Sequence, residues 1–120
     1  MKKRTEKRIR GDRGESRAAF YLMLRGYRIL ERNYTFGHKE IDIIASRRDV
    51  IAFVEVKTRS DVKNVAPHHA VTQQKQYNLA AAAKGYCMTH SVKGKQLRFD
   101  IAEVPVRGRI NYIKNAFCPQ

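Results

Sequence analysis

Three side chains of this chain have the types and the spacing that metal-assisted hydrolysis of a phosphodiester requires. Asp42 lies in the isoleucine-rich segment EIDIIA, and Glu55 and Lys57 lie in the β-branched and aromatic segment VIAFVEVK. The reaction needs a divalent cation, an activated water and a positive charge near the phosphate. Because Mg²⁺ binds oxygen ligands and usually takes one or two carboxylates from a protein, acids set among apolar strand residues are the first candidates for a metal site.

The spacing of these residues places them on shared strand faces. Glu40 and Asp42 are two residues apart, as are Glu55 and Lys57. Residues two apart in a strand point to the same side. If the two segments are neighbouring strands, one face of the pair therefore carries acids on both strands and a lysine on one.

The stretch SRRD between the two segments also predicts how they pair. It suits a turn, so we expect an antiparallel hairpin with Ile44 near Ile51 or Ala52. In that register Asp42 reaches the neighbourhood of Glu55, within the spacing of a shared metal ion.

A plainer interpretation of the same residues is a solvated protein surface. Glu55 and Lys57 would then form a salt bridge on an exposed strand face, and Glu40 and Asp42 would be hydrated. Spacing alone favours neither interpretation. If the acids are buried, however, each unpaired charge costs several kcal/mol, so that they need a metal ion or a cationic partner such as Lys57.

A third acid, Glu15, lies on the apolar face of a predicted helix. It precedes Ala18 and Ala19 by three and four residues and Leu22 by seven, which is the spacing of one helical face. Its carboxylate is therefore expected to point at the sheet. The commoner role for Glu in a first helical turn is to complement the helix dipole, and the sequence leaves both roles open.

The elements that must position these acids follow from apolar periodicity and from turn residues. The chain is expected to form one α/β domain over residues 1–120, with a basic and flexible segment at residues 1–12. The order of the elements predicts helices packed on a mixed sheet. The predicted helices are 14–24, ended by Gly26, and 70–84, preceded by Pro67 and ended by Gly85; the predicted strands are 27–33, 40–45, 50–57, 97–104 and 110–114.

The charge of the chain indicates an anionic partner. Twenty-five Lys and Arg against eleven Asp and Glu give a formal net charge of +14. Such an excess favours nucleic acid over the competing partner, an anionic membrane surface. No apolar run approaches the roughly 18–20 residues that span a bilayer. With only Cys87 and Cys118, no disulfide framework is expected, and a reducing cytoplasmic location is the default.

The motifs together resemble those of the YraN-like bacterial family, which is assigned to the PD-(D/E)xK, or restriction-endonuclease-like, nuclease superfamily. The resemblance covers nearly the whole chain, and the joint set is specific although each motif alone is not. The motifs are GDRGESRAA at 11–19, ERN at 31–33, EIDIIA at 40–45, FVEVKTR at 53–59, the helix start at 71–75, RFD at 98–100 and NAF at 115–117.

The resemblance implies a restriction-endonuclease-like core of α-β-β-β-α-β order, in which a mixed sheet is flanked by helices. It implies that Asp42 and Glu55 bind Mg²⁺ or Mn²⁺, with the backbone carbonyl of Val56 as a further ligand. Lys57 would then assist the phosphate or the water, and Glu15 would be the acid supplied by the helix. The residues expected to contact substrate are Gln74, Lys75 and Arg59.

The function expected on these grounds is a metal-dependent endonuclease acting on DNA, with branched or damaged DNA among its substrates. Holliday-junction resolvases of the superfamily are similar in function and act as dimers, so a homodimer is one expected assembly. The rival hypotheses are a non-catalytic nucleic-acid-binding module and an RNA- or ribosome-associated protein. Of the remaining polar residues, His68 and His69 are minor candidates for a site, and Asp100 is expected to be structural and paired with an arginine.

Overall fold

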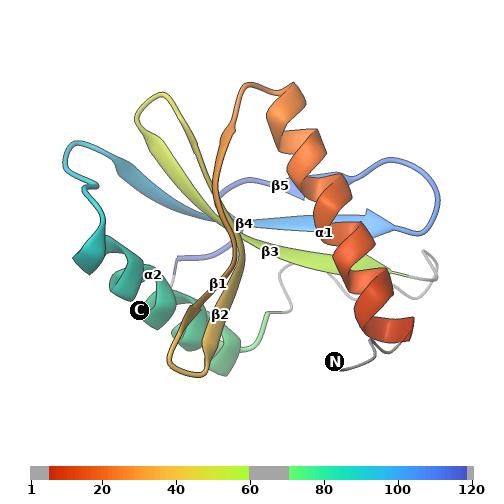
Figure 1. Ribbon diagram of the computed structural model, residues 1–120, viewed down its shortest axis with the longest axis horizontal. Coiled ribbons are helices and arrows are strands. Elements are labelled where there is room, and N and C mark those ends of the chain that lie inside the picture. Colours follow the sequence, from red (N-terminus) through yellow and green to blue (C-terminus); the bar gives the residue numbers. More distant parts are fainter. Residues whose placement is uncertain (1–5, 60–70, 119–120) are drawn as a thin grey trace, which may run out of the picture.

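The computed structural model describes residues 6–59 and 71–118, and it describes side chains from residue 13 onward except that of Arg59. The described part forms two helices and five strands in the predicted order (Figure 1). The α/β fold class is therefore confirmed. The elements are α1 (Glu6–Leu24), β1 (Arg28–Phe36), β2 (Lys39–Arg47), β3 (Val50–Arg59), α2 (Gln73–Thr89), β4 (Gln96–Pro105) and β5 (Asn111–Ile113).

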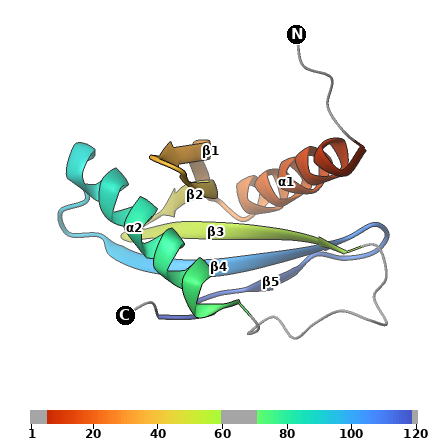
Figure 2. The same ribbon diagram turned by 90° about the horizontal axis from the view of Figure 1, so that it is seen from below.

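The five strands form one mixed sheet in the order β1-β2-β3-β4-β5. The first three strands make the expected antiparallel meander. β4 then pairs parallel with β3, and β5 returns antiparallel on β4. Parallel neighbours need a crossover connection, and α2 lies on that crossover (Figure 2). The sheet and its two flanking helices are consistent with a restriction-endonuclease-like core.

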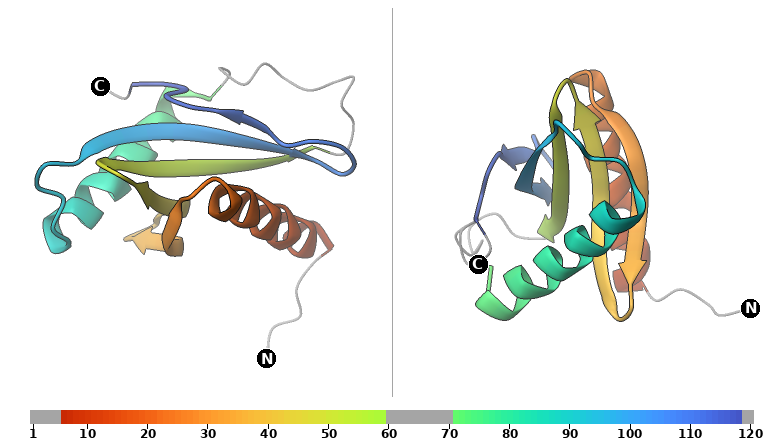
Figure 3. Two further views of the ribbon diagram at one scale, coloured as in Figure 1. Left: turned by 90° about the horizontal axis from the view of Figure 1, so that it is seen from above. Right: turned by 90° about the vertical axis from the view of Figure 1, so that its left-hand side faces the viewer.

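The two helices bury different apolar clusters, as the two sides of the sheet require (Figure 3). Ala18 and Leu22 of α1 pack in a cluster with Val54 of β3. Leu79 of α2 packs in a second cluster that contains Phe53. Because Phe53 and Val54 are consecutive, β3 is apolar on both faces, which is the pattern of a strand covered on two sides.

Glycine marks the end of one helix but not of the other. Gly26 has φ +87° and donates to the carbonyl of Met23, so it ends α1 as predicted. Gly85, which was expected to end the second helix, lies inside α2 and is buried. A Cβ there would overlap the ring of Phe36. The prediction was wrong because this glycine serves close packing and not a helix stop.

The start of α1 also differs from the prediction. The helix begins at Glu6 and not at Gly14. The sequence EKRIRGDR contains good helix formers, Glu, Lys and Arg, but almost no apolar residues. Apolar periodicity therefore gave no sign of the first turns. As a result Glu15 lies in the middle of α1, and its role as an acid in a first helical turn is excluded.

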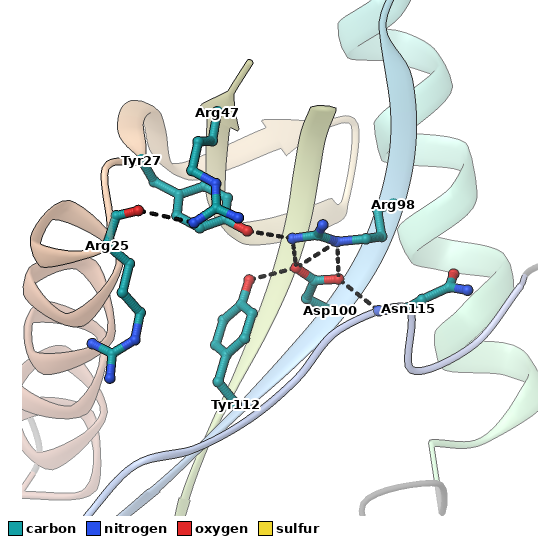
Figure 4. Close-up of polar contacts among 7 residues, drawn as sticks. All are labelled: Arg25, Tyr27, Arg47, Arg98, Asp100, Tyr112 and Asn115. Carbon is teal, nitrogen blue, oxygen red and sulfur yellow. Dashed lines mark hydrogen bonds and ion pairs between the residues drawn. The ribbon is translucent and has the colours of Figure 1, made fainter. Parts of the chain in front are cut away.

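An arginine–carboxylate network holds β4 and β5 to the end of α1 (Figure 4). Asp100 is fully buried and forms a bidentate pair with Arg98, at 2.8–3.1 Å. Its carboxylate also accepts from the hydroxyl of Tyr112 and from the backbone N–H of Asn115, while Arg98 donates to the hydroxyl of Tyr27. The structural role predicted for Asp100 and its pairing with an arginine are thus confirmed.

Within the described ranges, no helix has the length and apolar character needed to cross a bilayer.

A candidate metal site where two strands separate

The candidate site forms where β2 and β3 stop pairing. Their ladder runs from Arg47 and Val50 as far as Ile43 and Val54, and beyond this point the two strands no longer pair with each other. The next residues along the two strands are Asp42 and Glu55, so the two acids flank the point of separation.

The observed register differs slightly from the expected one. Ile44 pairs with Phe53, where the turn had predicted Ile51 or Ala52. The turn is tighter than expected, because Arg48 adopts φ +55° and Arg47 pairs directly with Val50. The expected approach of Asp42 to Glu55 survives the shift.

The carboxylate of Asp42 takes the place of a strand partner. Its Oδ2 accepts from the backbone N–H of Val56 at 2.8 Å, a donor that a longer ladder would have given to β2. A backbone N–H inside a sheet must find an acceptor. Asp42 is therefore fixed against the segment Glu55–Lys57, and the hydrogen bond orients one of its oxygens.

Glu55 is mostly buried and only partly neutralised. Its side chain is 12% exposed, and Oε1 lies 3.4 Å from Nζ of Lys75 on α2. The other oxygen, Oε2, is buried without a hydrogen-bond partner. The solvated-surface interpretation is therefore wrong for Glu55, and the cation that pairs with it is Lys75 and not Lys57.

The acids affect one another electrostatically. Burial, and then the charge of Asp42, raise the pKa of Glu55 from 4.5 to about 7 against the opposing effects of Lys75 and Lys57. Burial also raises the pKa of Asp42, although the Val56 N–H opposes this. The raised pKa values show that the surroundings of the two carboxylates do not fully compensate their negative charges. A bound cation would supply the missing positive charge.

Glu15 joins this group from the other side, through a close approach of α1 to β3. Gly14 is buried, and a Cβ there would overlap Cγ2 of Thr58. The approach buries Glu15 to 6% exposure. Burial, and then the charge of Asp42, raise its pKa, while Arg32 lowers it through a contact of 3.2 Å to Oε1. The expectation that this carboxylate points at the sheet is confirmed.

The structure adds Glu40 to the group and leaves Gln74 out of it. The charge of Glu40 raises the pKa values of both Asp42 and Glu15, although its own side chain is exposed. Its spacing of two residues from Asp42 was the signal that it shares the face. Gln74 donates to Asn78 within α2 and has no recorded contact with Glu55.

Of the other predicted residues, Lys57 is half-buried and its charge acts on Glu55. The side chain of Arg59 and the residues His68 and His69 lie outside the described part. Among the residues that are described, no three acidic, histidine or cysteine side chains converge into a complete metal cluster. A cation at this site would therefore depend on a small set of carboxylates, as Mg²⁺ sites commonly do.

The donor set fits a hard divalent cation. The orphaned Oε2 of Glu55 is a buried acceptor that needs a donor or a cation. The Asp42 carboxylate is held close by through its bond to the Val56 N–H. All the available atoms are oxygens, which suits Mg²⁺ or Mn²⁺ better than softer metals.

Comparison with known proteins identifies relatives that match most of the chain. The model of the family described as "Uncharacterised protein family UPF0102" matches residues 14–104, which include Glu15, Asp42, Glu55 and Lys57. A UPF0102 protein of Clostridioides difficile is 42% identical over 109 residues, covering 90% of this chain and 96% of its own. One from Caldanaerobacter subterraneus subsp. tengcongensis is 40% identical over 121 residues, covering 96% and 99%. One from Chlorobium phaeobacteroides is 43% identical over 97 residues, covering 81% and 76%.

The match spans the acids of α1, β2 and β3 together with the parallel strand β4, and the similarity to the relatives extends over most of each chain. This chain therefore belongs to the uncharacterised protein family UPF0102, the YraN-like family.

Proposed function

We propose that this chain is a metal-dependent endonuclease that hydrolyses phosphodiester bonds of DNA, including branched or damaged DNA. The observation that carries the proposal is the buried, unpartnered Oε2 of Glu55 beside Asp42, at a break in strand pairing. A purely structural pair of acids would be expected to have its oxygens satisfied. A pair kept partly unsatisfied is suited to bind a cation.

The residues that would hold this cation are Asp42, Glu55 and the backbone carbonyl of Val56. When bound, Mg²⁺ or Mn²⁺ would neutralise charge on the phosphate and activate the attacking water. The chain's own contribution is to keep both carboxylates dry and oriented. The Val56 N–H fixes Asp42, and the burial of Glu55 strengthens its interaction with any nearby positive charge.

The lysines supply positive charge on the substrate side of the acids. Nζ of Lys75 lies 3.4 Å from Glu55, and the side chain is 47% exposed, so it can contact a phosphate oxygen that approaches from solvent. Lys57 is the second cation near Glu55 and acts on the same group. Both can stabilise negative charge that develops on the phosphate.

Glu15 and Arg32 support the site from α1 and β1. Their contact of 3.2 Å partly neutralises Glu15. The charge of Asp42 acts on Glu15 in the opposite direction and raises its pKa. If a cation is bound, Glu15 would support the site by orienting water or accepting a proton. The contact with Arg32 ties this acid to the hairpin that carries Asp42.

DNA is the proposed substrate because the chain has a net charge of +14 in spite of the acids at this site. A pure nucleic-acid binder has no use for carboxylates that repel phosphate. The rival hypotheses of a non-catalytic binding module and of an RNA- or ribosome-associated protein predict salt-sensitive binding without metal-dependent cutting.

The test is a cleavage assay with matched variants. Purified protein is incubated with supercoiled, linear and four-way-junction DNA, and with the corresponding RNA duplex, in Mg²⁺, in Mn²⁺ and in EDTA. We expect metal-dependent cutting of DNA that is lost in Asp42→Asn and in Glu55→Gln. Asp49→Asn, an exposed acid in the β2–β3 turn, is the control and should cut normally.

The outcomes separate the hypotheses. Cutting that persists in both site variants would refute the site assignment. Tight binding of DNA without cutting under any metal condition would favour the binding module, and preferential binding of RNA would favour the ribosome-associated protein.

A further inference from the structure

A second polar feature lies at the C-terminal end of α1. A cavity of about 360 Å³ opens there between the end of this helix, the β2–β3 hairpin and β5. It combines aromatic walls with cationic side chains. We call it the tyrosine pocket, and its polar and aromatic lining consists of Tyr21, Tyr27, Tyr112, Arg25, Arg47 and Lys114.

The aromatic walls of the tyrosine pocket are fixed from behind by the network around Asp100 (Figure 4). The hydroxyl of Tyr27 accepts from Arg98, and the hydroxyl of Tyr112 donates to Asp100. Burial, and then Asp100, raise the pKa of Tyr112, so its hydroxyl remains a donor at neutral pH. The ring of Tyr112 also stacks on that of Tyr21, with centroids 5.6 Å apart. The walls are therefore ordered before any ligand arrives.

The cations of the pocket are held by rings and carbonyl groups. The guanidinium of Arg47 lies 4.8 Å from the ring centroid of Tyr27 and donates to the carbonyl of Arg25 at 3.0 Å. The guanidinium of Arg25 lies 3.5 Å from the ring centroid of Tyr21. Within the described part of the chain, no carboxylate forms a salt bridge with Arg25, Arg47 or Lys114. Most of their N–H donors thus remain available to an anion.

We propose that the tyrosine pocket binds a phosphate group of the DNA backbone, away from the phosphate that is cut. The guanidinium fork matches the oxygens of a phosphate, and the net charge of +14 favours a polyanionic ligand. Asp100, the nearby acid, does not oppose this binding because it is fully buried and paired with Arg98. The inference rests on the proposed function for the identity of the nucleic acid.

The position of the pocket gives it a role different from that of the acids. Glu15 contacts Arg32 of β1 from the middle of α1. The pocket is lined by Tyr21, Leu22 and Arg25, near the C-terminal end of the same helix. A helix rises about 1.5 Å per residue, so these residues, which follow Glu15 by six to ten positions, lie roughly 9–15 Å further along α1, or about three to four base-pair steps of DNA. The pocket contributes affinity and orientation, and it does not touch the reacting atoms.

The test measures DNA binding without cleavage. The full chain carries Asp42→Asn and is kept in EDTA, and the affinity for a labelled DNA duplex is measured by fluorescence anisotropy at several salt concentrations. The pocket variant is Arg25→Gln with Lys114→Gln, both exposed positions. The control variant is Lys84→Gln with Lys93→Gln, which removes the same charge from exposed positions in α2 and the loop after it.

Relative to the control, we expect the pocket variant to bind DNA roughly tenfold more weakly, because charge-assisted hydrogen bonds are lost. Its log–log salt slope should fall by about one, as the loss of one phosphate contact requires. Arg47→Gln should weaken binding in the same direction. Thermal melts in parallel check that each variant is folded.

Equal affinity and equal salt slope for the pocket and control variants would overturn the inference, as would a chain that binds no DNA. A titration with inorganic phosphate, monitored by the amide chemical shifts around Tyr27, tests whether the pocket binds free phosphate instead of the DNA backbone. If inorganic phosphate binds there while DNA affinity is unchanged, the pocket is a small-anion site and the inference fails. Because binding is measured without metal, a loss of DNA affinity in the pocket variant supports this inference even if the chain never cleaves DNA. Conversely, cleavage by a chain whose pocket variant binds DNA normally refutes this inference and leaves the proposed function intact.

Discussion

Glu55→Gln should make the metal-free protein more stable at alkaline pH. The pKa of Glu55 is about 7 in the folded protein, against an ordinary value of 4.5. The folded state therefore binds more protons than the unfolded state between these values, and the free energy of unfolding falls as pH rises through this window. The neutral amide of the variant avoids this penalty.

The size of the effect follows from the pKa difference. Each pKa unit corresponds to about 1.4 kcal/mol. The advantage of the variant should thus grow from about 1 kcal/mol at pH 5 to about 3 kcal/mol at pH 8. The ion pair of Glu55 with Lys75 is already included in the raised pKa, so it does not offset the figure again.

The assay is urea denaturation followed by far-UV circular dichroism at pH 5, 6, 7 and 8 in EDTA. Glu31→Gln, on the exposed surface of β1, is the control and should show no pH-dependent advantage. Addition of Mg²⁺ at pH 8 should stabilise the unaltered chain and leave Glu55→Gln unchanged, since a ligand that binds only the folded state stabilises it by mass action.

Two results would refute this reasoning. One is a Glu55→Gln protein that is less stable than the unaltered chain at pH 8. The other is a stability difference that stays constant between pH 5 and pH 8, because only a titrating group changes the slope. Stabilisation of both proteins by Mg²⁺ to the same extent would place the cation elsewhere.

Three further predictions concern two closely packed glycines and the lysine that pairs with Glu55. Gly14→Ala should lower the free energy of unfolding by about 1–3 kcal/mol through overlap with Thr58, and Thr58→Ser, which removes the overlapping methyl, should restore most of it in chemical denaturation. Lys75→Gln should raise the pKa of Glu55 further, because Lys75 lowers it now; a carboxyl NMR titration that shows no rise would contradict the ion pair. Gly85→Ala should destabilise the chain by about 1–3 kcal/mol through the aromatic ring packed against it, and an unchanged melting temperature would argue against that contact.

The central pair of the site was predictable because its determinants are local in sequence. The short turn between the two strands predicted that Asp42 lies near Glu55, and the two-residue spacing of Glu40 from Asp42 predicted that both share one face. Neither prediction needed the rest of the fold. An error in register did not change this outcome, since the turn admits only a small shift. The burial of Glu15 was likewise predictable from its position on the apolar face of α1.

The partners of these acids were not predictable, because they come from distant elements. Lys75 reaches Glu55 from α2, after a crossover whose geometry depends on the parallel pairing of β3 with β4. Arg32 reaches Glu15 through the packing of α1 against β1. Gly85 looked like a helix stop because local sequence cannot show that the ring of Phe36 lies against it.

The crossover through α2 also determines the order in which the site is assembled. The hairpin that joins Asp42 to Glu55 closes a short loop, whereas Lys75 comes from α2, whose packing on β2 and β1 is non-local in sequence and therefore slower. During folding the two carboxylates thus meet before their lysine does. We therefore expect formation of the hairpin, the early step, to be faster in acid or in the presence of divalent cations, either of which relieves the repulsion between the acids before α2 docks.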